Sequence, residues 1–401
     1  MGRQRRPFKI HLYASRRHSR AVSSYNLAAF LPSGKVAVVP SVKKESPGLS
    51  AHATPHDGEA AERRHDEIVR SSRAGFRRDR DRIFNSRAFL MLDQKTELYT
   101  EPTGGQSPSR LLYAMRAAAT ARTLAELLHL NVDVTETAVL AQRLGLPPFG
   151  RAGTETLAAL MASHGGFDPI SQSLRIVDEL EAKYPEFNGL NLSHAVRESL
   201  RPATKQSLSL ETQGGAWAAR IATLCLDVEL GLEAGLIDEA RLSDFPLWRE
   251  IAEPTDRHYP KLEPIRRRHY HFRNLLSMLV DRVVEHSHSA VGKPSIGLNP
   301  RFEAGFETFE RWVAAETRRN PFDALYRDRA ACLEELFAIL VHRPHLLGES
   351  ALVRLKKEGV HRAVADFLAQ RGDRELLRLR REVVGEREIP AGRAAEQSLL
   401  L

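Results

Sequence analysis

The sequence predicts an all-α fold of helical bundles, and two observations carry this prediction. Apolar residues recur at three- and four-residue spacing through most of the chain after residue 61, which is the period of an amphipathic helix. Glycine and proline separate these periodic segments, and the alternating pattern of strands is rare. With 401 residues, of which 42% are hydrophobic, the chain can bury a large core in one or two domains.

Residues 1–62 are expected to form a basic, disordered leader. Residues 1–50 hold ten Lys and Arg residues against one Glu, so this part accounts for the net charge of +8. A basic tail binds nucleic acid through phosphate contacts, but a plain disordered extension or a wrongly chosen start codon explains the same composition. A strand is expected at Val36–Val39, as one arm of a hairpin after Pro32–Gly34.

The helices are expected in a regular order after the leader. The first runs over residues 111–130 and the second over residues 134–144, where Gly145 and Pro147-Pro148 end it. Further helices are expected over residues 153–163, 170–183, 208–234, 259–287, 305–317, 326–341, 350–370 and 373–383.

The composition also excludes several classes of protein. There is no apolar run of the roughly 18 residues that a transmembrane helix needs, so no membrane partner is expected. No apolar stretch follows the basic N-terminus, which excludes a secretory signal. Cys225 and Cys332 make no disulfide framework. We therefore expect a cytoplasmic protein.

Several segments, in one order, resemble the bacterial deoxyguanosinetriphosphate triphosphohydrolase family within the HD superfamily. They cover roughly residues 65–380. Each segment alone is too common to identify a family, and the resemblance rests on their occurrence in this order. The segments are Phe76–Phe89 with Leu92–Thr96, Ser109–Tyr113, Leu140–Gly153, His164–Asp168 with Gln172–Ile176 and Phe187–Leu192, Ala219–Ala222 with Asp227 and Leu232–Ile237, and Arg266–Arg268.

The resemblance implies a fold, an activity and a cofactor. It implies an HD-type domain over residues 63–240, a helical C-terminal phosphohydrolase-associated region over residues 241–390, and an oligomer. Active members of the family split a deoxynucleoside triphosphate into deoxynucleoside and inorganic triphosphate. They use a divalent metal such as Mg²⁺ or Mn²⁺, held by a His, a His-Asp pair and a later Asp, with a further catalytic His.

Mapped onto this chain, the metal-ligand positions carry other residues. The first His falls on Tyr113, the His-Asp pair on Gln142 and Arg143, and the late Asp on Ala219. The catalytic His falls on Arg151. Ala has no donor atom, and Arg is always protonated and repels a dication. We therefore expect no retained catalytic residue and no metal cofactor.

The same mapping leaves a set of cations for a possible nucleotide site. The resemblance places Arg110 at a phosphate-contacting position and Lys95 in the loop that approaches the nucleotide, and Arg143 and Arg151 add positive charge. Arginines bind phosphate through paired hydrogen bonds, so the four could hold a deoxynucleoside triphosphate without cleaving it. Alternatively, the site has decayed and its arginines reach solvent or pair with Asp227 and Glu229.

Other constellations are weaker. The pairs His286/His288 and His269/His271 point to different faces of a helix, so solvated or capping roles are favoured over metal binding. Arg266–Arg268, with Lys261, is either a phosphate-binding or a solvated helix face, and Trp217 and Trp248 are expected in the core.

Three functions follow from these observations. The first is an inactive member of the family, a regulatory subunit that binds a nucleotide, an active paralogue, or both, as a homo- or hetero-oligomer. The second is an active deoxynucleoside triphosphate triphosphohydrolase with ligands from elsewhere or a metal-free route. The third is a nucleic-acid-binding protein that uses residues 1–50 and the Arg-rich helix. The substituted ligand positions favour the first over the second, and the fold alone decides none of them.

Overall fold

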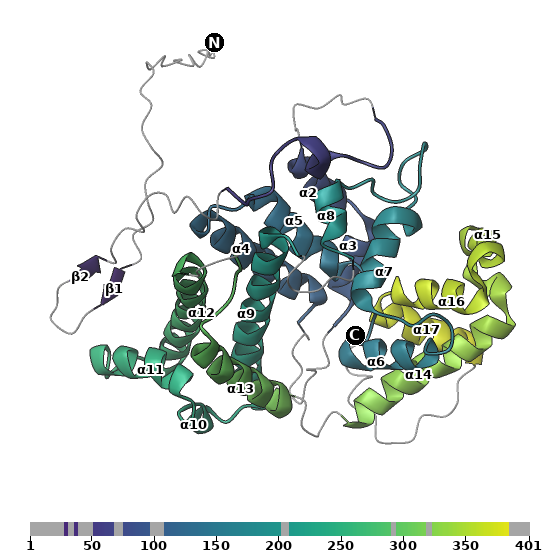
Figure 1. Cartoon of the computed structure of the whole chain (residues 1–401). Helices are drawn as coiled ribbons and strands as arrows, with labels where there is room; N and C mark the ends of the chain where they lie inside the picture. The colour runs from purple at the N-terminus through teal and green to yellow at the C-terminus, as the bar shows by residue number, and fades with distance from the viewer. Residues whose placement is uncertain are drawn as a thin grey trace, which may run out of the picture. The chain divides into compact units, whose positions relative to one another are not determined.

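The computed structural model describes residues 28–30, 36–38, 51–67, 75–96, 108–201, 208–289, 294–317 and 323–384. The chain divides into two compact units, Met1–Ser46 and Pro47–Leu401. The described secondary structure of the larger unit is helical, apart from one β-bridge between Thr96 and Ser109. The predicted all-α fold is therefore confirmed, and Figure 1 shows the helices of this unit packed side by side.

The smaller unit contains, among its described residues, one pair of short antiparallel strands. Strand β1 (Ala28–Phe30) pairs with strand β2 (Val36–Val38), with Ala29 opposite Ala37. This confirms the strand that the sequence predicts at this position, while the predicted turn at residues 32–34 lies outside the described residues.

Three helices form the centre of the larger unit, namely α4 (Arg110–Leu127), α5 (Val132–Arg143) and α9 (Leu210–Glu233). Each begins after a residue whose side chain accepts a hydrogen bond from the first turn, which satisfies a free backbone N–H; these residues are Ser109, Asn131 and Ser209. Small buried side chains on α4 let α9 approach closely, and they are Ala114, Ala117, Ala118 and Ala121.

The remaining helices surround this centre. They are α2 (Phe76–Phe84), α3 (Arg87–Met91), α6 (Gly150–Leu160), α7 (Pro169–Arg175) with a π-helical turn (Ile176–Leu180), α8 (His194–Glu198), α10 (Glu239–Leu242), α11 (Pro246–His258), α12 (Pro264–Ser289), α13 (Pro300–Thr317), α14 (Asp323–His342), α15 (Glu349–Glu358), α16 (Val360–Ala369) and α17 (Asp373–Val384). Short 3-10 turns lie at Gly58–Ala61, Leu92–Gln94 and Pro344–Leu347. None of the helices in the described part of the chain is long and apolar enough to cross a bilayer.

The helices after residue 240 belong to two hydrophobic cores. Helices α11, α12 and α13 pack on α9 and share its core, where Trp217 and Trp248 are buried as predicted. Helices α14 to α17 form a second core with α6, and Figure 1 shows this group beside α6 and α7. The sequence groups residues 241–390 as one region, but its helices belong to two different cores. The reason is that α14 buries its apolar face against α6 and not against α13.

Residues 51–62, which the sequence assigns to the leader, pack on the bundle. The backbone N–H and the hydroxyl of Thr54 donate to the carboxylate of Glu211, at 2.8 and 2.7 Å. The backbone N–H of His194 donates to the carbonyl of Glu62 at 2.7 Å. Glu211 is fully buried, and a buried carboxylate requires hydrogen-bond donors. These contacts depend on residues far away in the sequence, so the composition of residues 51–62 does not predict them.

Candidate functional site

The turn between α5 and α6 has the tight geometry that its sequence suggests. A Cβ atom at Gly145 would lie 2.1 Å from the carbonyl oxygen of Pro169, and one at Gly153 would lie 1.8 Å from that of Pro148. Phe149 has a left-handed φ of 61° just before α6 begins. Only glycine fits the two crowded positions, so the turn fixes where α5 and α6 meet.

The four positions at which the resemblance places metal ligands do not supply a ligand set. Tyr113 is buried on α4, and its hydroxyl donates to Asp227 Oδ1 at 2.9 Å. The side-chain N–H of Gln142 donates to the carbonyl of Ser199 at 3.1 Å. Arg143 is half-buried at the end of α5, and Ala219 is half-buried on α9.

The residue of α9 that meets Tyr113 is Asp227, and not Ala219. Eight residues separate the two positions, which corresponds to about 12 Å along a helix. The sequence singles out Asp227 within the family-like segment but does not predict this contact, because α4 and α9 are brought together only by the tertiary fold. An ion pair between Arg116 on α4 and Glu229 on α9, at 3.3 Å, also links the two helices.

This donor set does not fit a divalent cation. Such an ion requires several imidazole nitrogens or carboxylate oxygens converging on one point. Here a phenol directs its proton toward the carboxylate of Asp227, an amide directs an N–H at a carbonyl, and Arg143 brings a fixed positive charge. Among the described residues, no three His, Cys, Asp or Glu side chains gather as a metal site would need.

Lys95 is a fully buried cation. Its ammonium group donates to the carbonyls of Leu146, in the turn before α6, and Ala369, at the end of α16, at 2.7 and 2.8 Å. Burial lowers the pKa of Lys95 to about 7, although the carboxylate of Asp373 opposes this effect. Two of its three N–H donors thus hold the C-terminal helices to the turn, and its contact with a nucleotide stays a prediction.

Asp373, the first residue of α17, reinforces the same junction. Its carboxylate accepts hydrogen bonds from the backbone N–H and hydroxyl of Thr96, at 3.1 and 2.6 Å, and from the backbone N–H of Phe149, at 2.9 Å. Burial raises the pKa of Asp373 despite these bonds. Gly372 lies so close to Gln94 that a Cβ atom there would approach the Gln94 Cβ to 2.7 Å. The sequence does not predict the contact between Thr96 and Asp373, because more than 270 residues separate them.

Arg151 and Arg110 lie in different surroundings. The guanidinium of Arg151 lies 4.8 Å from the ring centroid of Tyr326 on α14 and 3.9 Å from Glu155. Tyr326 in turn donates to Glu155 at 2.5 Å. Arg110 is buried at the start of α4, and its backbone N–H donates to the carbonyl of Lys95 at 2.8 Å. The structure therefore brings Arg110 and Lys95 together but turns Arg151 toward α14.

Two hollows on the described surface are lined by none of these residues. One, of about 270 Å³, is lined by Ala338, Ile339, His342, Arg343 and Val383. Another, of about 440 Å³, is lined by Glu253, Asp256 and Arg257.

The structure also shows the surroundings of the histidine pairs and of the basic segment Arg266–Arg268. His271 is buried against Trp248, while His269 is exposed on the other side of α12. The side chain of His288 lies outside the described part. The arginines of the basic helix pair with Glu263, Asp256 and Glu239 at 3.6, 3.4 and 2.8 Å for Arg266, Arg267 and Arg268 respectively. These pairs favour the solvated-face interpretation of this segment.

The larger unit thus defines an all-α helical-bundle protein, in which the α5–α6 turn joins a central helix to the core of the C-terminal helices. No protein-family model matches the chain. The chain is 32% identical to a "deoxyguanosinetriphosphate triphosphohydrolase-like protein" of Thiobacillus denitrificans over 375 residues, covering 86% of this chain and 99% of that protein. It is 33% identical to a protein of that name from Bordetella pertussis, over 80% of this chain and 92% of the relative.

A third relative of the same name, from Paracoccus denitrificans, is 39% identical over 56% of this chain and 66% of its own length. The chain therefore belongs to the deoxyguanosinetriphosphate triphosphohydrolase-like family.

Proposed function

We propose that this chain is a member of the family that does not hydrolyse nucleotides and acts as a regulatory subunit of an active paralogue. One observation carries the proposal: the positions of the metal ligands hold Tyr113, Gln142, Arg143 and Ala219, of which the first two direct their polar hydrogens at other acceptors. Without converging lone pairs, the site lacks the groups that would hold a cation to polarise a phosphate and activate water.

The contacts of two of the four predicted cations argue against tight nucleotide binding. Lys95 holds the C-terminal helices, and Arg151 stacks on Tyr326. We propose that Arg110 and Arg143, near the junction of α4 and α5 with the turn, make the nucleotide contacts that remain. Weak binding of a deoxynucleoside triphosphate through these two residues would then modulate the association with the paralogue.

The test mixes the purified chain with an active family member that has the complete His, His-Asp and Asp set. We expect the two to co-elute on size exclusion at a fixed ratio, and the rate of triphosphate release by the active partner to change when the chain is added. Separate elution with an unchanged rate would contradict the proposal.

A second arm tests the nucleotide contacts. Arg110→Gln and Arg143→Gln should each weaken binding of a deoxynucleoside triphosphate to the isolated chain about tenfold, because each removes a charge-assisted hydrogen bond. The matched control is Arg116→Gln on the same helix α4, which removes a half-exposed cation paired with Glu229. Equal losses in all three variants would indicate general charge attraction and contradict these roles.

A further inference from the structure

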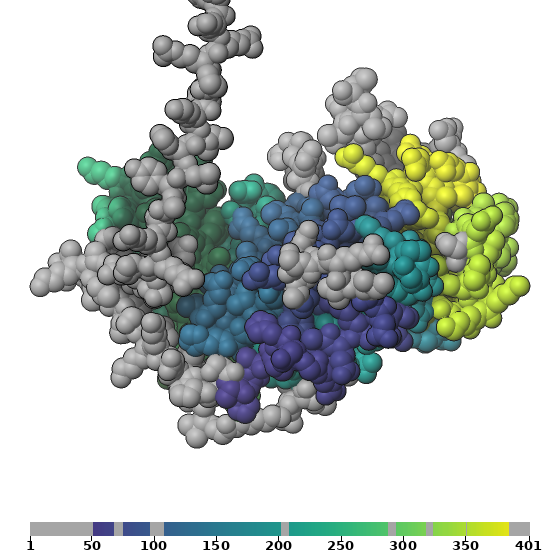
Figure 2. Space-filling view, turned by 90° about the horizontal axis from the view of Figure 1, so that it is seen from above, coloured from purple at the N-terminus to yellow at the C-terminus, as the bar shows by residue number. Residues whose placement is uncertain are grey.

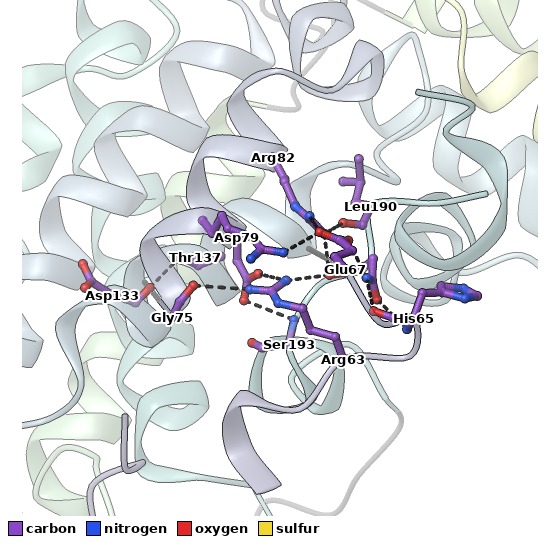
Figure 3. Close-up of polar contacts among 12 residues, drawn as sticks. Arg63, His65, Glu67, Gly75, Asp79, Arg82, Asp133, Thr137, Leu190 and Ser193 are labelled. Carbon is purple, nitrogen blue, oxygen red and sulfur yellow. Dashed lines mark hydrogen bonds and ion pairs between the residues drawn. The ribbon is translucent and has the colours of Figure 1, made fainter. Parts of the chain in front are cut away.

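The segment of residues 63–67, here called the strap, is held against α2 and against the loop before α8. Arg63 pairs with the buried carboxylate of Asp79 at 2.6 Å. Asn191 accepts a hydrogen bond from the backbone N–H of His65 at 3.1 Å, and its own N–H group donates to the His65 carbonyl at 2.8 Å and to Glu67 at 2.6 Å. Figure 3 shows these groups converging, and Figure 2 shows the purple N-terminal residues of the larger unit at its surface.

The strap places an aromatic ring on an aromatic platform. The imidazole of His65 stacks on Phe187 with a centroid separation of 4.9 Å and an interplanar angle of 3°. Tyr184 lies 5.0 Å from the ring of Phe187, and the guanidinium of Arg82 lies 5.0 Å from the ring of Tyr184. Phe187 is buried, whereas His65 is exposed. Proteins stack nucleobases on aromatic side chains in the same way, so the imidazole of His65 lies where a base could stack on Phe187.

The strap also places a carboxylate between two arginines. One oxygen of Glu67 accepts hydrogen bonds from both Arg78 and Arg82. Arg82 is held in place because it donates to the carbonyls of Leu190 and Asn191, each at 2.8 Å. Two guanidinium groups fixed around one anionic oxygen are the arrangement in which proteins bind a phosphate.

The charges of this cluster leave room for one more negative charge. Three guanidinium groups, of Arg63, Arg78 and Arg82, face the two carboxylates of Glu67 and Asp79. Burial lowers the pKa of Arg78, the neighbouring cations Arg63 and Arg82 lower it further, and the carboxylates of Glu67 and Asp79 oppose this effect. A phosphate dianion in place of Glu67 would bring the cluster to neutrality.

We propose that Arg78, Arg82, Tyr184, Phe187 and Asn191 form a binding site for a purine nucleoside monophosphate, which His65 and Glu67 of the strap fill in the absence of ligand. The base stacks on Phe187 where the imidazole lies, and the phosphate takes the place of the carboxylate. Binding therefore displaces residues 65–67 while Arg63 keeps its pair with Asp79. This site does not depend on the residues of the α5–α6 turn, so it stands apart from the proposed regulatory function.

The test measures binding of adenosine monophosphate and of inorganic phosphate to the full chain by calorimetry. Removing the internal occupant should strengthen binding, so Glu67→Ala and His65→Ala/Glu67→Ala are expected to bind the nucleotide about tenfold or more tightly than the original chain. Adding Arg78→Met to the double variant should reverse this gain. Arg78 is the suitable position because Glu67 is its hydrogen-bond partner, whereas Arg82 also supports the backbone.

The matched control is Arg77→Met, which removes an exposed cation of the same helix that pairs with Asp133 at 3.2 Å. It should leave the affinity of the double variant unchanged, and circular dichroism should show that every variant is folded. Three outcomes would overturn the proposal: no gain in affinity in the double variant, an equal loss with Arg77→Met and Arg78→Met, or equal affinity for phosphate alone, which would remove the role of the stacked base.

Discussion

Tyr113 on α4 and Asp227 on α9 form a hydrogen bond of 2.9 Å at the position where the family resemblance places its first metal ligand. A phenol and a carboxylate joined in this way satisfy each other, so neither needs a cation for its polar atoms. The bond also ties together two of the three central helices. Tyr113 is therefore part of the scaffold in this chain.

The first prediction concerns the stability of this contact. Tyr113→Phe should lower the free energy of unfolding by about 1–2 kcal/mol, because it removes a buried hydroxyl that donates to a carboxylate. Urea denaturation measures the change. Tyr326→Phe is the control, since it removes a similar bond, to Glu155, in an exposed setting, where the loss should be smaller. A larger loss in Tyr326→Phe would contradict the structural role of Tyr113.

The second prediction concerns the pH dependence that Lys95 creates. Its pKa falls from 10.5 to about 7 on folding, so between these values the unfolded chain binds more protons than the folded one. The contribution of Lys95 to the free energy of unfolding must then rise with pH through this window, by roughly 2 kcal/mol from pH 7 to pH 9. Guanidinium denaturation of the original chain and of Lys95→Met at both pH values isolates this contribution.

The variant should lose this part of the pH dependence, since methionine fills the same space without a titrating group. The same slope in both proteins would show that Lys95 keeps an ordinary pKa and is not enclosed by α16. The variant also leaves the carbonyls of Leu146 and Ala369 without their donor, so it should be less stable than the original chain at pH 9.

The third prediction concerns the α5–α6 turn. Gly153→Ala should lower the free energy of unfolding by about 3 kcal/mol or more, because the new Cβ atom would lie 1.8 Å from the Pro148 carbonyl oxygen and the backbone must move. Gly305→Ala is the control in an exposed helix, where a Cβ atom meets nothing within 4 Å. It should raise the free energy by about 0.5–1 kcal/mol. Thermal unfolding of both variants measures the difference, and similar values would contradict the close packing of the turn.

Local features of the fold could be predicted from the sequence. The periodicity predicts the helices near 111–130 and 134–144, and the structure has α4 and α5 there, within a few residues. Gly145, Pro147 and Pro148 predict the break before α6, because they cannot continue a helix. These signals are local, so one sequence is enough to detect them.

The long-range contacts that hold Lys95 and Asp373 in place could not be predicted from the sequence. Lys95 meets Ala369, and Asp373 meets Thr96 and Phe149, only because α14 to α17 pack on α6. A lysine in a family-like loop has the same sequence pattern whether it points to a ligand or to a distant carbonyl. The substitution of the metal-ligand positions stays a prediction, which rests on the lack of a donor atom in Ala219 and of a lone pair in Arg143.

We expect that this chain does not hydrolyse deoxynucleoside triphosphates, and an assay for inorganic triphosphate tests this expectation. The purified full chain is incubated with each of the four deoxynucleoside triphosphates and with Mg²⁺ or Mn²⁺, and inorganic triphosphate is quantified alongside an active family member. We expect no release above the rate without enzyme for any nucleotide. Turnover that is lost in Gln142→Ala or Arg110→Gln would contradict it, because the working site would then lie at the positions that here hold no ligand set.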